Sequence, residues 1–153
     1  MHSAQETVQT VHSAQKSVNM IPITSRTQYR VRYADTDQMG VIYYGSYGRL
    51  FEIGRTEMIR EMGLPYIELE KTGIMMPVYS MESKYRKVLK YDELVTIETT
   101  VKDLPAVRME FYHRIFNEAG ELAHEAKVVL VFMDSKSGRP VRVPSQLLDL
   151  LKS

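Results

Sequence analysis

The sequence predicts an α+β domain in which an antiparallel five-stranded sheet wraps around one long helix. Three observations lead to this fold class: an alternating run near residue 27, a stretch of helical periodicity after it, and four strand-like runs that follow one another. Consecutive strands without intervening helices favour antiparallel pairing. The 153 residues are enough for one domain with a real core and too few for two ordinary domains.

Residues 1–24 carry only Glu6 and Lys16 as charges, contain no aromatic residue, and repeat His-Ser-Ala-Gln at 2–5 and 12–15. We expect a poorly ordered leader here, without the basic start and apolar stretch of a secretory signal. The folded domain is expected over residues 25–153. Its first strand is indicated from Thr27 by alternation. The polar residues at 28, 30 and 32 lie on one face, and the other face carries Tyr29, Val31 and Tyr33.

The long helix is predicted over about residues 46–62. Apolar residues recur there at helical spacing, Ser46 can cap its start, and Gly63 followed by Pro65 can end it. Gly54 lies on the apolar face and indicates close approach to a sheet or to a partner helix.

An irregular connection is expected over residues 65–77, followed by strands at about 78–89, 94–103, 106–117 and 121–133. Alternation is clearest in the middle two strands, and turn-forming residues separate all four. A short helix is expected after Pro144.

Composition narrows the classes of function. The net charge of +1 gives no broad field for nucleic acid, so no nucleic-acid partner is expected. No apolar run approaches the roughly 18 residues that would span a bilayer, so we expect no membrane insertion and a cytoplasmic location. The chain lacks Cys, which excludes a thiol nucleophile, a disulfide framework and any Cys-ligated metal.

Several familiar catalytic patterns are absent from the sequence. Gly45-Ser46-Tyr47-Gly48 has the wrong spacing for a serine hydrolase elbow, and the acidic run at 35–40 lacks the Glu that closes a calcium loop. His113 and His124 fall on predicted strands without ligand-spaced neighbours, and we interpret them as packed or hydrogen-bonded side chains. No metal site is predicted.

Asp37 is the remaining candidate for chemistry, because it lies in a loop seven residues before Tyr44, near the start of the long helix. One interpretation is a loop carboxylate stabilised by the positive end of the helix. The other is a catalytic carboxylate beside helix amides that polarise a carbonyl oxygen. Its position alone leaves both open.

The wider segment decides between them by resemblance. Tyr33-Ala-Asp-Thr-Asp37-Gln-Met-Gly40-Val-Ile-Tyr43-Tyr44-Gly-Ser-Tyr47, followed by Phe51-Glu52-Ile-Gly-Arg55-Thr-Glu57, resembles the motif of hotdog-fold acyl-CoA thioesterases of the hydroxybenzoyl-CoA thioesterase type. The nearest similarity is to the branch associated with the bacterial Tol–Pal envelope system. The resemblance runs from about Thr27 to the C-terminus and implies a hotdog fold.

This resemblance implies an enzyme that hydrolyses a short-chain, medium-chain or aromatic acyl-CoA to free acid and CoA. Asp37 takes the place of the family's nucleophile or general base, and the backbone N–H of Tyr44 takes the place of the group that binds the thioester oxygen. Neither a metal nor a redox cofactor is implied. Family members form homodimers with sites at the subunit interface and often assemble further, so a homodimer or homotetramer is expected.

The sequence also departs from the family pattern. The Tol–Pal branch commonly has His at the position of Tyr44. A tyrosine there resembles the hydroxybenzoyl type better. Three basic residues could meet the CoA phosphates: Arg108, Arg139 and Arg142. Tyr43 could contact the acyl group. Glu52 is the reserve catalytic acid, although pairing with Arg55 is the preferred interpretation. Met39, Met75, Met76 and Met81 could line an acyl tunnel or fill the core.

Two alternatives from other classes remain open. A non-catalytic module of the same fold would bind or sense acyl-CoA without turnover, and the retained Asp37 argues against it. A structural partner of an envelope complex would show partner-dependent localisation and no thioester turnover.

Overall fold

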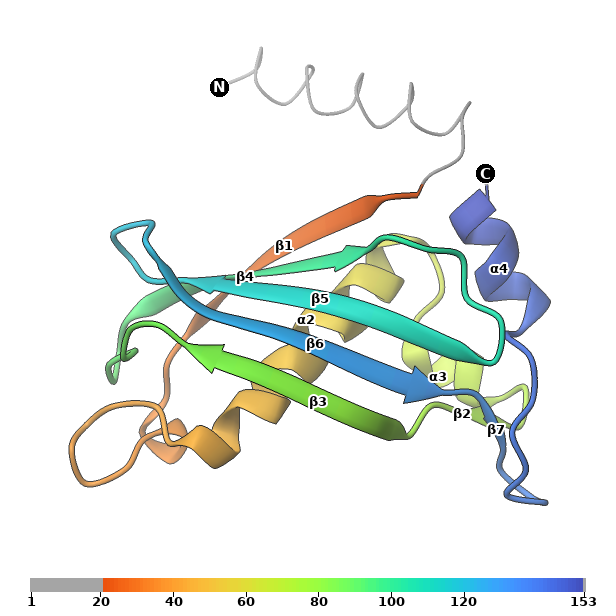
Figure 1. Cartoon of the computed structure of the whole chain (residues 1–153), viewed down its shortest axis with the longest axis horizontal. Helices are drawn as coiled ribbons and strands as arrows, with labels where there is room; N and C mark the ends of the chain where they lie inside the picture. Colours follow the sequence, from red (N-terminus) through yellow and green to blue (C-terminus); the bar gives the residue numbers. More distant parts are fainter. Residues whose placement is uncertain (1–20, 153) are drawn as a thin grey trace, which may run out of the picture.

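The computed structural model describes residues 21–152, which form one five-stranded antiparallel sheet around a central helix (Figure 1). The order of strands across the sheet is β1-β4-β5-β6-β3, with every neighbouring pair antiparallel. Their bounds are β1 Ile23–Arg30, β3 Val78–Tyr85, β4 Leu94–Val101, β5 Arg108–Phe116 and β6 Leu122–Val131. The predicted fold class and the number of strands are confirmed.

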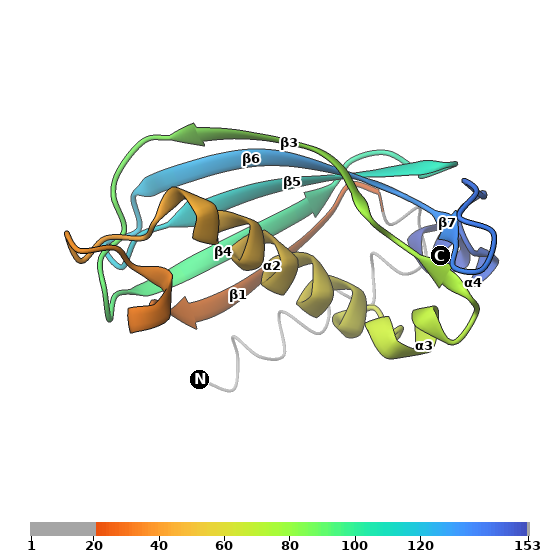
Figure 2. The same ribbon diagram turned by 90° about the horizontal axis from the view of Figure 1, so that it is seen from below.

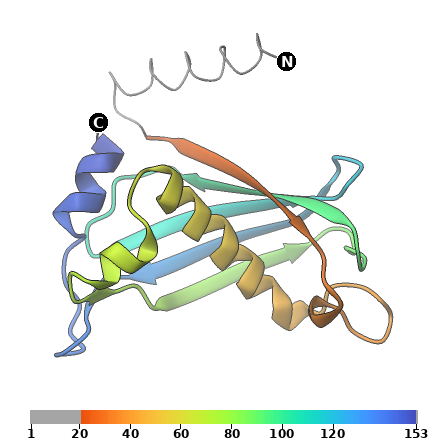
Figure 3. The ribbon, with the colours of Figure 1, turned by 180° about the vertical axis from the view of Figure 1, so that it is seen from behind.

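The long helix α2 (Tyr47–Glu61) lies across one face of the sheet, which curves around it (Figures 2 and 3). A 3-10 turn at Tyr44–Ser46 leads directly into it, so the predicted helix is confirmed to within one residue. It ends as expected, because Gly63 adopts a left-handed φ of 94° immediately after the cap residue Met62. Ser46, however, makes no side-chain capping hydrogen bond, and that part of the prediction was wrong.

The core forms where α2 meets the inner face of the sheet. Leu50, Phe51 and Met58 of the helix and Ile97, Phe111 and Val128 of three strands have no exposed surface. Each strand contributes alternate residues to this face, as the period of two requires. Gly54 lies against the sheet, since an added Cβ would come within 2.5 Å of Thr99 Oγ1 and 2.8 Å of Ile97 Cγ2. The close approach predicted at Gly54 is therefore to the sheet.

Smaller elements complete the end of the sheet that lies next to the C-terminus. The connection expected to be irregular over 65–77 contains a short helix α3 (Tyr66–Glu70) and the two-residue strand β2 (Ile74–Met75). β2 pairs with β7 (Met133–Asp134), and the predicted terminal helix is α4 (Ser145–Lys152). The sequence missed α3 and β2 because neither is long enough to show a period.

The first strand differs most from its prediction. β1 begins at Ile23, four residues before the predicted start, because residues 23–30 all pair with β4. It ends at Arg30, and Tyr33, expected on the buried face, is 81% exposed in a 3-10 turn (Tyr33–Asp35). The prediction was wrong because the alternation of apolar and polar residues in the sequence continues to Tyr33, beyond Arg30, the last residue that pairs with β4. Residues 1–20 of the predicted leader lie outside the described residues.

Candidate active site

Asp37 lies in a tight hairpin between β1 and α2. The two arms are joined by a hydrogen bond from the Asp37 amide to the Val41 carbonyl (3.0 Å) and another from the Tyr43 amide to the Asp35 carbonyl (3.0 Å). An antiparallel bridge joins Thr36 and Ile42 between them. The hairpin therefore spans residues 35–43 and places Asp37 next to its turn.

The turn itself depends on the Asp37 side chain. Its Oδ1 accepts a hydrogen bond from the Met39 amide (2.9 Å), and its carbonyl accepts one from the Gly40 amide (3.0 Å). Gly40 has a φ of 75°, a left-handed conformation that glycine adopts without strain. The sequence Asp-Gln-Met-Gly thus folds as a local turn that fixes the Asp37 carboxyl group.

A second segment holds the hairpin from its other side. The Ile42 amide donates to the Leu89 carbonyl (2.7 Å), and the Tyr91 amide donates to the Gly40 carbonyl (2.9 Å). Leu89 has no exposed surface and belongs to the core. The hairpin is consequently part of the folded domain and not a free surface loop.

The hairpin leads straight into the start of α2. Among the residues that the structure describes, the amides of Tyr44 and Gly45 have no acceptor, whereas those of Ser46 and Tyr47 donate to the carbonyls of Tyr43 and Tyr44. Unpaired N–H groups at a helix start carry partial positive charge and bind anions or polarised oxygens. Two free donors therefore lie directly after the hairpin that carries Asp37.

Exposed aromatic side chains surround this position. Tyr43 and Tyr44 are 43% and 69% exposed, and their rings lie 4.3 Å apart. The contact with Tyr44, through a hydrogen bond and charge interaction, raises the pKa of Tyr43. Met39 is also exposed. The site is thus open in the single chain.

The sequence overlooked Asp35, although it lies in the same motif. Asp35 has no exposed surface; its Oδ2 accepts hydrogen bonds from the Tyr29 hydroxyl (2.6 Å) and the Arg32 amide (2.8 Å), and its Oδ1 forms an ion pair with Arg49. No local pattern could reveal this, because Tyr29 and Arg49 come from β1 and α2. Their approach is a product of the tertiary fold.

The other predicted site residues do not gather around Asp37. The hairpin lies at the sheet end where Arg30 pairs with Leu94, whereas Arg108 lies at the opposite end, where it pairs with Val131. Arg139 and Arg142 follow β7 at that far end and are exposed. Strands of 8 to 10 residues span roughly 25–30 Å. One chain alone therefore does not bring these three arginines to Asp37.

Glu52 is exposed on α2, and its charge acts on Arg55, but among the described residues the two form no ion pair at contact distance. Arg55 is only 9% exposed, and burial lowers its pKa, although Glu52 and Tyr66 oppose that shift. Of the four methionines considered for an acyl tunnel, Met76 is buried in the core. The other three are exposed: Met39, Met75 and Met81.

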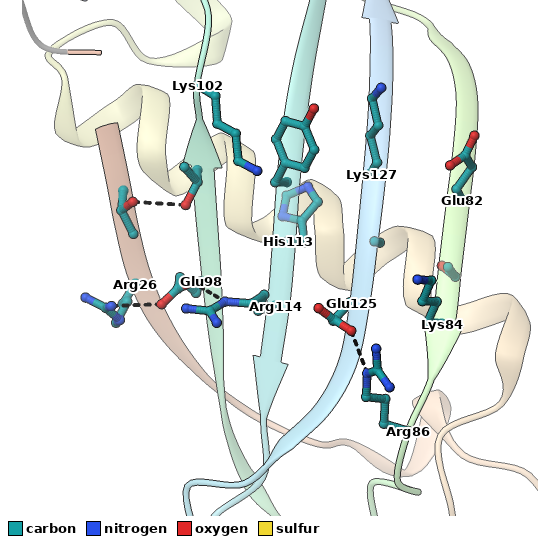
Figure 4. A pocket seen from close by; sticks show the side chains of 15 residues that line it. Arg26, Glu82, Lys84, Arg86, Glu98, Lys102, His113, Arg114, Glu125 and Lys127 are labelled. Atoms are coloured by element: carbon teal, nitrogen blue, oxygen red, sulfur yellow. Dashed lines mark hydrogen bonds and ion pairs between the residues drawn. The ribbon is translucent and has the colours of Figure 1, made fainter. Parts of the chain in front are cut away.

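A hollow of about 790 Å³ lies on the outer face of the sheet (Figure 4), and none of its lining residues belongs to the hairpin. A row of alternating charge crosses all five strands there, and its members are Arg26, Glu98, Arg114, Glu125 and Lys84. Glu98 is 4% exposed and pairs with both neighbouring guanidiniums; burial opposes its ionisation, but those contacts outweigh burial and lower its pKa. Glu98 thus satisfies two of the arginines in the row, Glu125 pairs with Arg86 beside it, and the row contains none of the predicted site residues.

Within residues 21–152, no group of three or more His, Asp or Glu side chains could hold a metal ion. No helix in the same range is long and apolar enough to cross a membrane.

Comparisons with known proteins agree with this architecture. YneP of Bacillus subtilis (strain 168) is 35% identical over 118 residues, which are 77% of this chain and 86% of YneP. The acyl-CoA thioester hydrolase YbgC of Escherichia coli O6:H1 is 30% identical over 123 residues, 80% of this chain and 92% of YbgC. The crystal structure of a DHNA-CoA thioesterase from Staphylococcus aureus matches with a TM-score of 0.78 and 36% identity, covering 82% of this chain and 85% of that one.

The model of the thioesterase-like superfamily matches residues 31–151, which include the hairpin, α2 and the remaining four strands of the five-stranded sheet. The matched range covers most of the chain, and the prediction of a hotdog fold is confirmed. This chain therefore belongs to the thioesterase-like superfamily and, as the sequence predicted, is a thioester hydrolase.

Proposed function

We propose that this protein hydrolyses a short-chain, medium-chain or aromatic acyl-CoA to the free acid and CoA. The observation that carries the proposal is the hairpin of residues 35–43, which holds the Asp37 carboxyl group immediately before a helix start with two unpaired amides. A carboxylate as nucleophile or base, together with free N–H donors that stabilise the oxyanion, can hydrolyse a thioester. YbgC and the Staphylococcus aureus enzyme act on acyl-CoA and DHNA-CoA by name, which supports this substrate class.

Asp37 can act in either of two ways. As nucleophile, its carboxylate attacks the thioester carbon, the C–S bond breaks with release of CoA thiolate, and water then hydrolyses the mixed anhydride. As general base, it accepts a proton from the water that attacks the same carbon. A thiolate is a good leaving group, so neither route needs a separate general acid.

The Tyr44 amide is proposed to donate to the thioester oxygen. Negative charge grows on that oxygen as the carbon becomes tetrahedral, and an oriented N–H at a helix start stabilises it without reorganisation. Because the backbone does this work, the Tyr44 phenol is left for packing or for shaping the substrate site together with Tyr43. The tyrosine here, in place of His, favours the hydroxybenzoyl type over the Tol–Pal branch.

The active assembly is proposed to be a homodimer, or a homotetramer built from such dimers. Within residues 21–152, β3 is an edge strand that pairs with β6 alone. Its exposed apolar side chains are Val78, Tyr79, Met81 and Tyr85. An unprotected apolar edge favours pairing with a second strand. Antiparallel pairing of two β3 edges would bring the Asp37 end of one protomer next to the Arg108 end of the other, where Arg108, Arg139 and Arg142 could meet the CoA phosphates.

The test is release of free thiol from a panel of acyl-CoAs by the purified full chain and by two variants. Asp37→Asn is expected to lower kcat by about 10² to 10⁴ while the variant stays folded, because a positioned acid–base or nucleophilic group contributes that much. Tyr44→Phe is the matched control and should keep most activity, since it leaves the amide unchanged.

Each contrary outcome is informative. Activity of Asp37→Asn within threefold of the parent would remove Asp37 from the mechanism and make Glu52 the next candidate. Binding of acyl-CoA by the parent without any thiol release would support the non-catalytic binding module. Loss of activity in Tyr44→Phe at equal stability would assign the phenol, and not the amide, to catalysis.

A further inference from the structure

The Asp35 carboxylate belongs to no group assigned above, and yet it is the most completely enclosed acid near the hairpin. Each of its neighbours is a donor: the Tyr29 hydroxyl and the Arg32 amide reach Oδ2, and the Arg49 guanidinium reaches Oδ1. A buried carboxylate is tolerated only when its oxygens are paired in this way. Three donors, from β1, from the loop that follows it and from α2, thus converge on one side chain.

These contacts join the elements that frame the site. Tyr29 lies on β1, Asp35 begins the hairpin, and Arg49 lies in the first turn of α2. The Asp35 carbonyl also accepts the Tyr43 amide, which fixes the far arm of the hairpin (3.0 Å). The proposed catalytic Asp37 lies two residues after Asp35, and Tyr44 follows Tyr43 directly.

The Tyr29 ring is held as firmly as its hydroxyl. The guanidinium carbons of Arg32 and Arg49 lie 5.5 Å and 5.8 Å from the ring centroid, within the range of cation–π attraction. Tyr29 is 8% exposed and belongs to the core cluster. Asp35 is therefore attached, through Tyr29, to a rigid part of the sheet.

We propose that Asp35 is a positioning residue for thioester hydrolysis, which with Arg49 and Tyr29 sets the Asp37 hairpin at a fixed distance and angle to the start of α2. The inference depends on the proposed function of Asp37 and the Tyr44 amide. Asp37 acts at the carbon of the thioester carbonyl and the Tyr44 amide acts at its oxygen, so the distance between these two groups must stay fixed. A displacement of about 1 Å can lower the rate by about 10²-fold. The Asp35 side chain contacts Arg49 of α2, and its carbonyl accepts the Tyr43 amide of the hairpin.

Asp35→Asn is the sharpest variant, because it keeps the shape and turns one acceptor into a donor that faces donors. We expect kcat on an acyl-CoA that the parent hydrolyses to fall by about 10²-fold, with KM within threefold. Arg49→Gln should lower kcat by about tenfold. Combining the two should lower kcat no further than Asp35→Asn alone, since residues of one network are not additive.

Glu98→Gln supplies the matched control. Glu98 is another buried carboxylate that pairs with two arginines, but it lies on the outer face of the sheet, away from the hairpin. It should lower the melting temperature while leaving kcat within twofold of the parent. A kcat loss in Glu98→Gln equal to that of Asp35→Asn would show general destabilisation and overturn the positioning role.

Hydrogen exchange gives a readout that does not depend on catalysis. In Asp35→Asn the Tyr43 amide should exchange at least tenfold faster, because the base of the hairpin loosens, while amides of β5 stay protected. If Asp35→Asn does not fold, Tyr29→Phe and Arg49→Gln carry the same test, and unchanged kcat and exchange in both would overturn the inference. A parent without activity on any acyl-CoA would instead refute the proposed function, while faster Tyr43 exchange would still support the role of Asp35 in the hairpin.

Discussion

Two histidines lie between the sheet and α2 with almost no exposed surface. His113 stacks on Phe51 and its Nδ1 lies 3.1 Å from Thr99 Oγ1, while His124 stacks on Tyr47 and its Nε2 lies 3.1 Å from Ser83 Oγ. The sequence interpretation of both as packed, hydrogen-bonded residues is confirmed. Burial, with Arg55 and then His124 nearby, lowers the pKa of His113 to about 3, and burial lowers the pKa of His124 to about 4.

These two pKa values predict how stability depends on pH. Below the ordinary His pKa of about 6.5, these two histidines bind protons in the unfolded chain but stay neutral in the folded chain. The free energy of unfolding therefore decreases as pH falls. The loss is at most about 1.4 kcal/mol per pH unit for each histidine. The free energy of unfolding, measured by urea titration, should therefore be about 2 to 4 kcal/mol lower at about pH 5 than at about pH 7.5.

His124→Phe is the variant that checks the cause, because it keeps an aromatic ring against Tyr47. The dependence on pH should become about half as steep in this window, which lies above the range where carboxylates such as Glu98 titrate. If the free energy of unfolding of His124→Phe depends on pH as steeply as that of the parent, then groups other than His124 cause the dependence.

At the scale of single elements, α2 is set against the sheet by the absence of a side chain at Gly54. The gap accepts no Cβ, since Thr99 Oγ1 would be 2.5 Å away. Gly54→Ala should therefore lower the free energy of unfolding by about 1 to 3 kcal/mol, because the helix must move away from β4. Thermal or urea unfolding followed by circular dichroism measures the effect.

Gly48 provides the control on the same helix. A Cβ added there meets nothing nearer than Met81 Cε at 3.7 Å, which is ordinary contact. Gly48→Ala should therefore leave stability unchanged or raise it by up to about 1 kcal/mol, as alanine is the better helix former. Equal destabilisation by both substitutions would show that the close contact of Gly54 with the sheet does not set the cost.

At the scale of the whole molecule, the sheet has two unlike edges. β3 is exposed along most of its length and carries apolar side chains, whereas β1 at the other edge shows exposed Arg26, Gln28 and Arg30. Charged and polar edges resist pairing, and apolar edges favour it. The proposed homodimer therefore uses β3.

Met81→Lys should shift the protein towards monomer, as measured by light scattering after size-exclusion chromatography, and should lower kcat/KM. The reason is that a charge on a half-exposed apolar edge residue opposes burial in an interface. Gln28→Lys, the same new charge on β1, should change neither mass nor activity. A monomeric parent with full activity would contradict the proposed dimer.

The sequence by itself determined the parts of the fold that are local. The alternation of residues 95–101 and 107–115, the helical spacing after residue 46 and the glycine at 63 each encode which face is buried and where an element ends, and all reappear in β4, β5 and α2. For Asp37 the sequence supplied only a hypothesis, through the resemblance of a long motif, since an acid near a helix start has an ordinary structural explanation.

The tertiary structure alone decided what depends on residues distant in sequence. Asp35 has no special pattern, and the contacts on which its proposed role depends exist only because Tyr29 and Arg49 fold onto it. Arg108 is predicted to meet the CoA phosphates, but antiparallel strands carry it to the end of the sheet opposite Asp37. Periodicity records how each residue meets its neighbours along the chain, whereas burial of the common core determines which distant elements meet, and only packing of that core fixes those distances.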